Sequence, residues 1–380
     1  MSLTGSLFVG GVTALAVLAF VGLVAMWPRL AGRRPGGILA RATLLLTVNV
    51  LVLLAAALQM NAKYLFFADW TDLTGALGGK VTATALSRGG SGAKAVDANV
   101  AGTAAAAAAT LPPLPRAADR PAGVITATVQ GSLSGLTGTV VVRIPPQYTA
   151  PSRARTRYPV LETFSGYPGT PMQWLDTMKL ASAVDIAAAQ KRMRPVLIVS
   201  PQLEFPVGVD TECVDGAPGP AAETWVTRDV PNYIAHTYRV STSRSSWATI
   251  GLSAGGWCAA MATMLHPAQY SAAIAVGGYF EPWFGPQYEG FPPGTAQAKR
   301  YDLVALAHTP PPVAIWMETS HSDPTSYASS ARFLKVVKPP LSITAVVLRN
   351  AGHRTSVWEE LLPRALNWLG STVPGFRPVR

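Results

Sequence analysis

A tight connection between a strand and a helix is the sequence feature that most constrains this chain. Residues 247–252 form an apolar run of strand length, and residues 254–265 have the composition of a helix. Ser253 lies between them, inside the segment Gly251-Leu252-Ser253-Ala254-Gly255. Small neighbours leave room for a strained turn that lifts the serine hydroxyl clear of the sheet. We therefore predict that Ser253 lies at a strand-to-helix turn.

A serine in this setting has the features of a nucleophile. The segment fits the pattern G-x-S-x-G. A helix that begins at Ala254 would direct its unpaired N–H groups and the positive end of its dipole at a developing oxyanion. A serine also needs a base. Of the 5 histidines, His353 comes just after a predicted strand and just before the last helix, which is where this arrangement requires the base.

Two carboxylates compete for the role of the acid that orients the histidine. The predicted strand 313–317 runs directly into Glu318, and the loop beyond it contains Asp323. Either could hold the imidazole of His353 in the correct tautomer. We favour Asp323 and keep Glu318 as the alternative. Asp323 could also serve only as the N-cap of the next helix.

A second oxyanion donor is expected in the loop that follows the predicted strand 158–164. This loop, Ser165 to Gly169, is small and turn-prone. The backbone N–H of Tyr167 or of Gly166 could therefore face the serine. Together with the N–H of Ala254 it would complete an oxyanion hole.

Strands and helices alternate along residues 123–380, which predicts an α/β domain with a mostly parallel sheet flanked by helices. The first two strands are expected to pair as a hairpin. The predicted strands are 124–129, 139–144, 158–164, 195–200, 247–252, 272–276, 313–317 and 342–348, and the predicted helices are 172–191, 223–238, 254–265 and 355–369.

Residues 1–70 predict a hairpin of two transmembrane helices. Residues 7–27 and 43–60 are uncharged and apolar, and each is long enough to cross a bilayer. Four arginines, at positions 29, 33, 34 and 41, lie between them. The positive-inside rule makes this loop cytoplasmic and the later residues extracytoplasmic. A signal peptide would carry its basic residues before the apolar run; two buried core helices are the other alternative.

Residues 71–122 are rich in Gly, Ala and Pro and predict a linker to the catalytic domain. In an exported domain, Cys213 and Cys258 would form a disulfide. The net charge of +11 suits anionic lipid at the membrane surface, and the scattered basic residues form no nucleic-acid motif. The aromatic segment 277–300 could be a lid or an ordinary long loop.

Several motifs resemble the esterase family that includes esterase D-type enzymes and the mycobacterial mycolyltransferases. The matching segments are Ser165 to Gly169 with Trp174, Glu223-Thr224-Trp225, Gly251 to Gly256, His266-Pro267 with Tyr270, and Gly352-His353. The resemblance implies an α/β-hydrolase fold, a Ser–Asp/Glu–His triad, the Tyr167 N–H as an oxyanion donor, no metal and no cofactor. Ser165 departs from the His or Asp that relatives usually have there.

These observations predict a membrane-anchored enzyme that hydrolyses carboxylic esters through an acyl-enzyme on Ser253. One alternative is an acyltransferase that passes the acyl group to a sugar or lipid hydroxyl of the cell envelope. Another is an envelope protein that keeps the fold only for binding. The expected partners are an ester or acyl-lipid substrate and the lipid bilayer, with no nucleic acid and no obligatory protein partner.

Overall fold

The computed structural model divides the chain into two compact units. One contains residues 1–82 together with residues 350–354, and the other contains residues 83–349 and 355–380. The residues that the structure describes are 3–30, 35–64, 66–75, 83–89, 123–216 and 219–379. The predicted linker therefore falls mostly outside the described residues.

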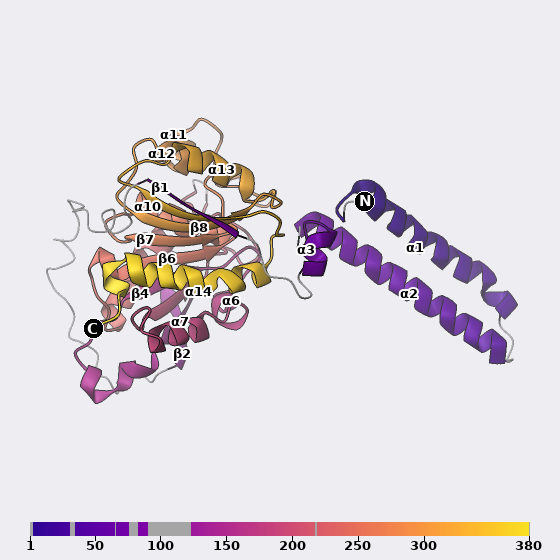
Figure 1. The fold of residues 1–380 in the computed structure, drawn as a ribbon, viewed down its shortest axis with the longest axis horizontal. Coiled ribbons are helices and arrows are strands. Elements are labelled where there is room, and N and C mark those ends of the chain that lie inside the picture. The colour runs from indigo at the N-terminus through magenta and orange to yellow at the C-terminus, as the bar shows by residue number, and fades with distance from the viewer. Residues whose placement is uncertain are drawn as a thin grey trace. The chain divides into compact units, whose positions relative to one another are not determined.

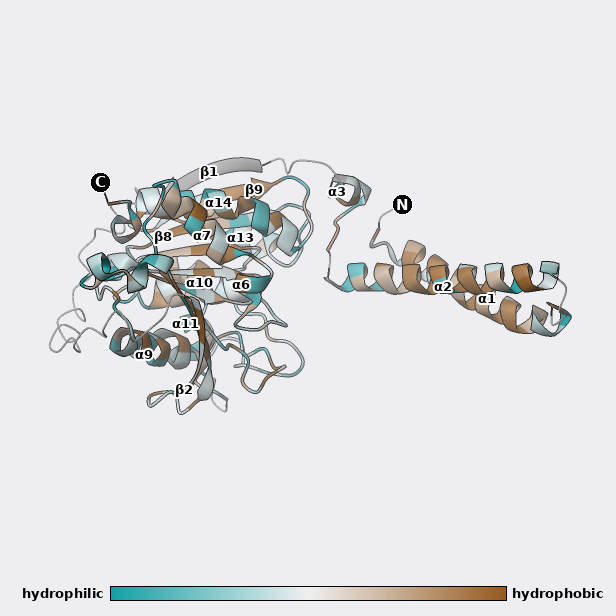
Figure 2. Ribbon diagram, turned by 90° about the horizontal axis from the view of Figure 1, so that it is seen from below, coloured by the Kyte–Doolittle hydropathy of each residue, from teal (hydrophilic) through white to brown (hydrophobic). Residues whose placement is uncertain are grey.

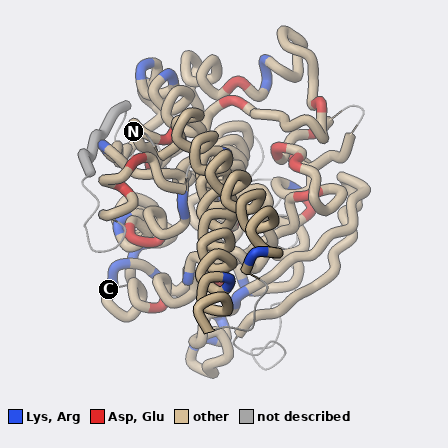
Figure 3. Tube along the Cα trace, turned by 90° about the vertical axis from the view of Figure 1, so that its right-hand side faces the viewer, with Lys and Arg blue, Asp and Glu red and all other residues tan. Residues whose placement is uncertain are grey.

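Two long apolar helices, α1 (Ser6–Met26) and α2 (Pro35–Tyr64), lie side by side in the first unit (Figure 1). The amide of Gln59 donates a hydrogen bond of 3.1 Å to the hydroxyl of Thr13 between them. Most of their residues are apolar (Figure 2), and few are charged (Figure 3). By length and composition each helix could cross a bilayer. The short helix α3 (Trp70–Gly75) follows them.

The second unit is built on a sheet whose nine described strands have the order β1-β9-β8-β7-β6-β4-β5-β3-β2. The strands from β9 to β5 are parallel to one another, whereas β1, β2 and β3 are antiparallel to their neighbours. The strands are β1 (Ala83–Gly89), β2 (Gly123–Gln130), β3 (Thr137–Ile144), β4 (Val160–Phe164), β5 (Leu197–Pro201), β6 (Trp247–Leu252), β7 (Ala272–Val276), β8 (Ala314–Ser320) and β9 (Ser342–Leu348).

Helices cover both faces of this sheet, and the central strands are completely buried between them. Helices α7 and α14 pack together on one face, and α10 packs on β4, β6 and β7 from the other (Figures 1 and 2). The helices are α6 (Gln173–Asp176), α7 (Leu180–Ala189), α8 (Ala222–Thr224), α9 (Val230–Thr237), α10 (Ala254–Leu265), α11 (Ala296–Arg300), α12 (Leu303–Leu306), α13 (Tyr327–Val336) and α14 (Thr355–Thr372). This is the α/β-hydrolase architecture expected from the sequence.

Two predicted helices are interrupted in the structure. The helix expected over 172–191 is divided into α6 and α7 at Lys179, whose φ of 50° is left-handed and cannot continue a helix. The helix expected over 223–238 contains one wider turn, a π-helix over Trp225–Asp229, between α8 and α9. Such turns insert without breaking the helix.

The expected linker and the expected strand before Glu318 also need correction. Helix α3 extends from Trp70 into residues 71–122, which also contain strand β1. Strand β1 pairs with β9, which would otherwise be an edge strand with unpaired backbone N–H and C=O groups. Strand β8 continues to Ser320, so Glu318 lies within the strand and not after it.

Candidate active site

Ser253 lies at the turn between β6 and α10 in a strained conformation, with φ 55° and ψ −124°. Few non-glycine residues have a positive φ, and they cluster at functional sites. The turn is possible because Gly251 and Gly255, two residues before and two residues after Ser253, lack side chains. A Cβ on Gly251 would lie 1.8 Å from the carbonyl oxygen of Gly255, and one on Gly255 would lie 2.2 Å from that of Phe164.

The loop after β4 lies directly beside this serine. A Cβ on Gly166 would lie 3.3 Å from the Cβ of Ser253. The Gly166 N–H donates a hydrogen bond of 2.8 Å to the side-chain carbonyl of Gln173, so it is already engaged. Among the described residues the Tyr167 N–H has no acceptor. Ala254 is the first residue of α10, where backbone N–H groups have no intrahelical acceptor.

Glu204 supports this loop from a neighbouring segment, although no sequence motif marked it. Its two carboxylate oxygens accept hydrogen bonds from the N–H groups of Gly169, at 2.9 Å, and Gly208, at 2.7 Å. The Tyr167 hydroxyl lies 2.9 Å from the carbonyl oxygen of Gly208 and 3.0 Å from the side-chain oxygen of Gln287. The loop is therefore braced at both ends.

The two candidate acids differ in their surroundings. Asp323 follows β8, and its carboxylate accepts hydrogen bonds from the N–H of Thr325, at 3.0 Å, and the hydroxyl of Ser326, at 2.6 Å. These contacts lie in the turn before α13 (Tyr327–Val336), whose N-cap residue is Ser326, so Asp323 is not the N-cap considered from the sequence. Glu318 lies inside β8, where its side chain accepts a hydrogen bond of 3.0 Å from the Gly277 N–H. Both residues are buried.

Burial and, to a smaller extent, the nearby negative charge of Asp323 raise the pKa of Glu318 to about 8, against the lowering effect of N–H groups from Gly277 and Trp358. Glu318 is therefore mostly protonated at pH 7. A neutral carboxylic acid stabilises an imidazolium less well than a carboxylate does. The electrostatics thus favour Asp323.

His353 lies in the connection between β9 and α14. Strands β8 and β9 are parallel neighbours, so Asp323 and His353 follow the carboxyl ends of adjacent strands. Ser253 follows the carboxyl end of β6 in the same parallel set. This chain order and strand placement match the order serine, acid, histidine that an α/β-hydrolase requires.

The loop around His353 forms one unit with the N-terminal segment. Asp72 accepts hydrogen bonds from the Gly352 N–H, at 2.9 Å, and from both terminal nitrogens of Arg354, at 2.6 and 2.8 Å. The carboxylate of Asp69 accepts from the side-chain amide of Asn350, at 2.9 and 3.0 Å. These contacts join residues about 280 positions apart in the chain.

His266, which the sequence placed at the end of the nucleophile helix, has a structural partner. Its Nε2 lies 2.6 Å from a carboxylate oxygen of Glu223, which also binds Arg300 and Tyr301. Burial raises the pKa of Glu223, but the bonds from His266 and Tyr301 and the charge of Arg300 outweigh it and hold the pKa below its ordinary value. This buried cluster explains why the motifs around Glu223 and His266 occur together.

Cys213 and Cys258 are joined by a disulfide with a Cα–Cα distance of 5.8 Å. The indole N–H of Trp257 donates a hydrogen bond of 2.8 Å to the carbonyl oxygen of Glu212 beside it. Both contacts fasten the 202–216 loop to α10, the helix that begins immediately after Ser253.

The segment 277–300 is largely packed. Phe280 and Phe291 are buried, and Phe284 and Phe291 form an edge-to-face pair with ring centroids 4.9 Å apart. Trp283 is 70% exposed, so a single large aromatic side chain points outward. Within the described residues no group of three His, Cys, Asp or Glu side chains could hold a metal ion.

Comparison with known proteins agrees with this geometry. Residues 135–369 match the Esterase family model. An uncharacterised protein of Corynebacterium glutamicum is 29% identical over 142 residues, which cover 37% of this chain and 33% of that relative. The match thus spans about a third of the relative's length.

Solved structures share the fold. A ferulic acid esterase superimposes with a TM-score of 0.55 at 19% identity, covering 66% of this chain and 98% of its own. An S-formylglutathione hydrolase from Agrobacterium tumefaciens gives 0.54 at 16% identity, with 66% and 95% covered. The fluorophosphonate-binding serine hydrolase F of Staphylococcus aureus gives 0.52 at 14% identity, with 66% and 99% covered.

Proposed function

Because the chain belongs to the esterase family, we propose that it is a membrane-anchored serine esterase that cleaves carboxylic esters through an acyl-enzyme on Ser253. The observation that carries the proposal is the conformation of Ser253, whose positive φ places it at a glycine-lined turn before α10. Membership of the family supports ester cleavage as the reaction class, and the turn supports Ser253 as the residue that attacks the ester.

The proposed reaction has two halves. The Ser253 hydroxyl attacks the ester carbonyl while His353 takes its proton, and His353 then returns that proton to the departing alcohol. Water next gives a proton to His353 as it attacks the acyl-enzyme, and His353 passes that proton to the Ser253 oxygen as the acid is released. In both halves the N–H groups of Ala254 and Tyr167 stabilise the oxyanion.

Asp323 is proposed to hold His353 in its working tautomer and to stabilise the imidazolium. Two features support it over Glu318. Its place beyond the end of β8 gives it access to a neighbouring loop, and the pKa of Glu318 is raised to about 8 by burial. Glu318 instead accepts the Gly277 N–H and thereby supports the backbone just after β7.

Anchoring by α1 and α2 is proposed because their outward side chains are apolar. Leu18 is 67% exposed and Leu53 is 69% exposed, and neither helix carries an acidic residue. Surfaces of this composition are unfavourable in water and favourable in lipid. By the positive-inside rule, the arginines between the apolar segments support a cytoplasmic connection and an extracytoplasmic catalytic unit.

A fluorophosphonate probe tests the nucleophile, because it forms a covalent bond with an activated serine. We expect wild-type protein to be labelled, Ser253→Ala to remain unlabelled, and His353→Ala to react much more slowly. Ser182→Ala, an exposed serine on α7, is the matched control and should label as wild type does. Equal labelling of Ser253→Ala would exclude Ser253 as the nucleophile.

Topology is tested separately with single introduced cysteines. Ser152→Cys, at an exposed position of the catalytic unit, should react with a membrane-impermeant maleimide in whole cells. Gly32→Cys, between the apolar helices, should react only after permeabilisation. The reverse pattern would invert the proposed orientation.

Product analysis separates hydrolysis from acyl transfer, since the two differ only in the acceptor that reaches the acyl-enzyme. With a chromogenic ester we expect the free acid as the product. A new glycerol or trehalose ester, formed when either alcohol is added, would establish transfer.

A further inference from the structure

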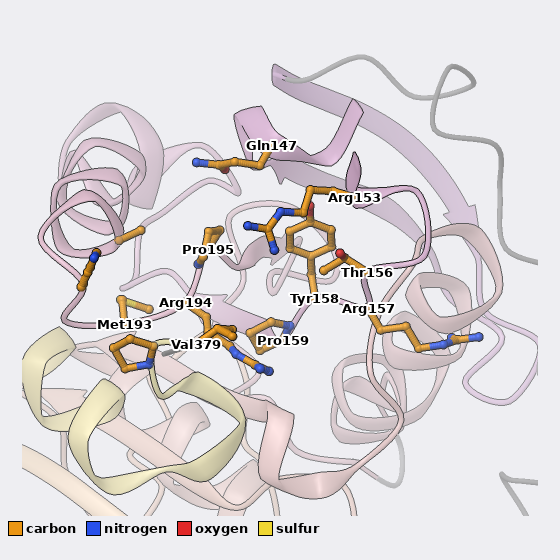
Figure 4. Close-up of a pocket in the computed structure, with 13 residues that line it drawn as sticks. Gln147, Arg153, Thr156, Arg157, Tyr158, Pro159, Met193, Arg194, Pro195 and Val379 are labelled. Carbon is orange, nitrogen blue, oxygen red and sulfur yellow. The ribbon is translucent and has the colours of Figure 1, made fainter. Parts of the chain in front are cut away.

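A cavity of about 450 Å³ (Figure 4) lies at the amino ends of the parallel strands β4 and β5. Its lining includes Pro159 and Pro195, which come just before β4 and β5. Because these strands are parallel to β6, their amino ends lie far from Ser253, which follows the carboxyl end of β6. The cavity has the size of a small-molecule site, and the proposed esterase reaction does not use it.

The lining of this cavity is strongly basic. Arg153, Arg157, Lys191 and Arg194 contribute to it, and none of its lining residues is an Asp or Glu. Arg157 points out of the cavity and donates a hydrogen bond of 3.1 Å to the carbonyl oxygen of Val240 (Figure 4). Three basic side chains therefore line the hollow with no Asp or Glu among the described lining residues to balance them, which raises the electrostatic free energy until an anion binds.

A further positive charge lies next to the cavity. Arg239 is completely buried, its guanidinium stacks over the ring of Tyr148 at 3.9 Å, and it donates hydrogen bonds to the carbonyl oxygens of Arg153, at 2.6 Å, and Tyr148. Neither acceptor carries a charge. The positive charges of Arg239 and Arg153 both act on Tyr158, which is part of the cavity lining.

Two buried polar atoms of the lining have no partner among the described residues. They are the hydroxyl of Tyr158 and the Nε of Arg194. Tyr158 is only 3% exposed, and its ring lies beneath Arg153 in the middle of the cavity (Figure 4). Unpaired buried polar groups are costly and are normally satisfied by a partner or a ligand.

Apolar groups complete the lining on the side of Met193 and Val379. The cavity therefore combines cationic groups with a hydrocarbon surface. We propose that it binds a phosphate-bearing ligand with an apolar body, the phosphate against Arg153, Lys191 and Arg194 and the body against Met193 and Val379. Guanidinium groups suit this role because they form charge-assisted, bidentate bonds with phosphate.

Isothermal titration of the full chain in neutral detergent tests the proposal with three probes. These are dihexanoyl phosphatidic acid, inorganic phosphate and dihexanoyl phosphatidylcholine. We expect saturable binding of the phosphatidic acid, weaker binding of phosphate, and none of the zwitterionic lipid. Comparable binding of both anions would assign the site to free phosphate. Absence of binding by both anions would overturn the proposal.

The double variant Arg153→Ala/Lys191→Asn locates the binding. Asparagine tolerates the left-handed φ of 54° at position 191. Each lost charge should weaken binding about tenfold, so we expect an affinity at least ~30-fold lower. Arg364→Ala, an exposed arginine on α14, is the matched control and should bind normally. Unchanged affinity in a double variant with wild-type circular dichroism would overturn the assignment to this cavity.

Fluorophosphonate labelling keeps this proposal separate from the esterase proposal. Because the cavity and Ser253 lie at opposite ends of the parallel strands, the fluorophosphonate should label the double variant at the wild-type rate. Loss of labelling in Ser253→Ala should leave phosphatidic acid binding unchanged.

Discussion

Ser253 and His353 each follow the carboxyl end of a parallel strand, yet the backbone around them is held in different ways. The serine turn is fixed by its immediate neighbours. Gly251 and Gly255 permit the close approach of strand, helix and the end of β4. The histidine loop is held from far along the chain, where Asp69 and Asp72 bind residues 350–354.

This difference explains what each region shows in the sequence. A turn made by adjacent residues leaves a short motif, because every group that shapes it lies within a few positions. A loop held by residues about 280 positions away leaves no such motif. The proposed nucleophile is therefore visible as a sequence pattern, whereas the contacts that support the proposed base appear only in the structure.

The largest effect is expected from Asp323, the acid that we propose orients His353. Asp323→Asn removes the charge that we propose stabilises the His353 imidazolium, so kcat/KM should fall by ~10³- to 10⁴-fold. Glu318→Gln should stay within about threefold of wild type, because the carboxyl of Glu318 is already mostly neutral at pH 7. The measurement is ester hydrolysis at pH 7, and the opposite ranking would make Glu318 the acid.

A substitution in the turn around Ser253 should lower the stability of the fold. A Cβ on Gly255 would lie 2.2 Å from the carbonyl oxygen of Phe164, in a position where only backbone can move. We expect Gly255→Ala to lower the free energy of unfolding by ~3 kcal/mol, as overpacking in a close-packed region does. Gly285→Ala meets no atom within 4 Å and should change it by less than ~0.5 kcal/mol. Chemical denaturation followed by circular dichroism compares them, and equal effects would refute the steric argument.

Much of the catalytic unit was accessible from the sequence because it depends on local patterns. The predicted strands 247–252, 272–276 and 342–348 coincide with β6, β7 and β9, since buried parallel strands form continuous apolar runs. The boundary of β8 was wrong by a few residues because Glu318 is polar yet buried inside the strand. Only the Gly277 N–H and the neighbouring groups make that burial acceptable.

Other features could not be predicted because they depend on distant partners. Strand β1 pairs with β9, although the composition of its own segment predicts a linker. Glu204 joins the proposed oxyanion loop to a second loop through the backbone N–H groups of Gly169 and Gly208, and such contacts leave no side-chain pattern. The basic cavity combines residues around 153–158, 191–195 and 379, which no sequence window contains together.

Substitution of Asp72, which contacts Arg354, tests whether distant residues position the loop that carries His353. The pair is buried and bidentate, with 4% and 11% of the two side chains exposed. Asp72→Asn weakens it and loosens the loop that carries His353. We expect kcat to fall ~10- to 30-fold with KM within threefold, since the role proposed for His353 is in the chemical step and not in binding.

Two further variants separate this positioning role from general stability. Arg354→Ala should reproduce the fall in kcat, whereas Arg364→Ala, at an exposed position, should not. Charge exchange in Asp72→Arg/Arg354→Asp should restore part of the activity. A lower melting temperature with unchanged kcat in Asp72→Asn would mean that these contacts stabilise the chain without positioning His353.

The smallest expected effect is the pH dependence of stability set by buried carboxyls near the sheet. Burial raises the pKa of both Glu162, on β4, and Glu318 to about 8 in the folded state. The folded state therefore holds protons that the unfolded state has lost between about pH 5 and pH 8, so stability falls as the pH rises through this window. Glu318→Gln removes one such proton and should flatten the slope by roughly 1 kcal/mol per pH unit. Urea denaturation at pH 5, 6, 7 and 8 measures it, and identical slopes in variant and wild type would show that Glu318 is ionised in the folded protein, which would return it as a candidate acid beside Asp323.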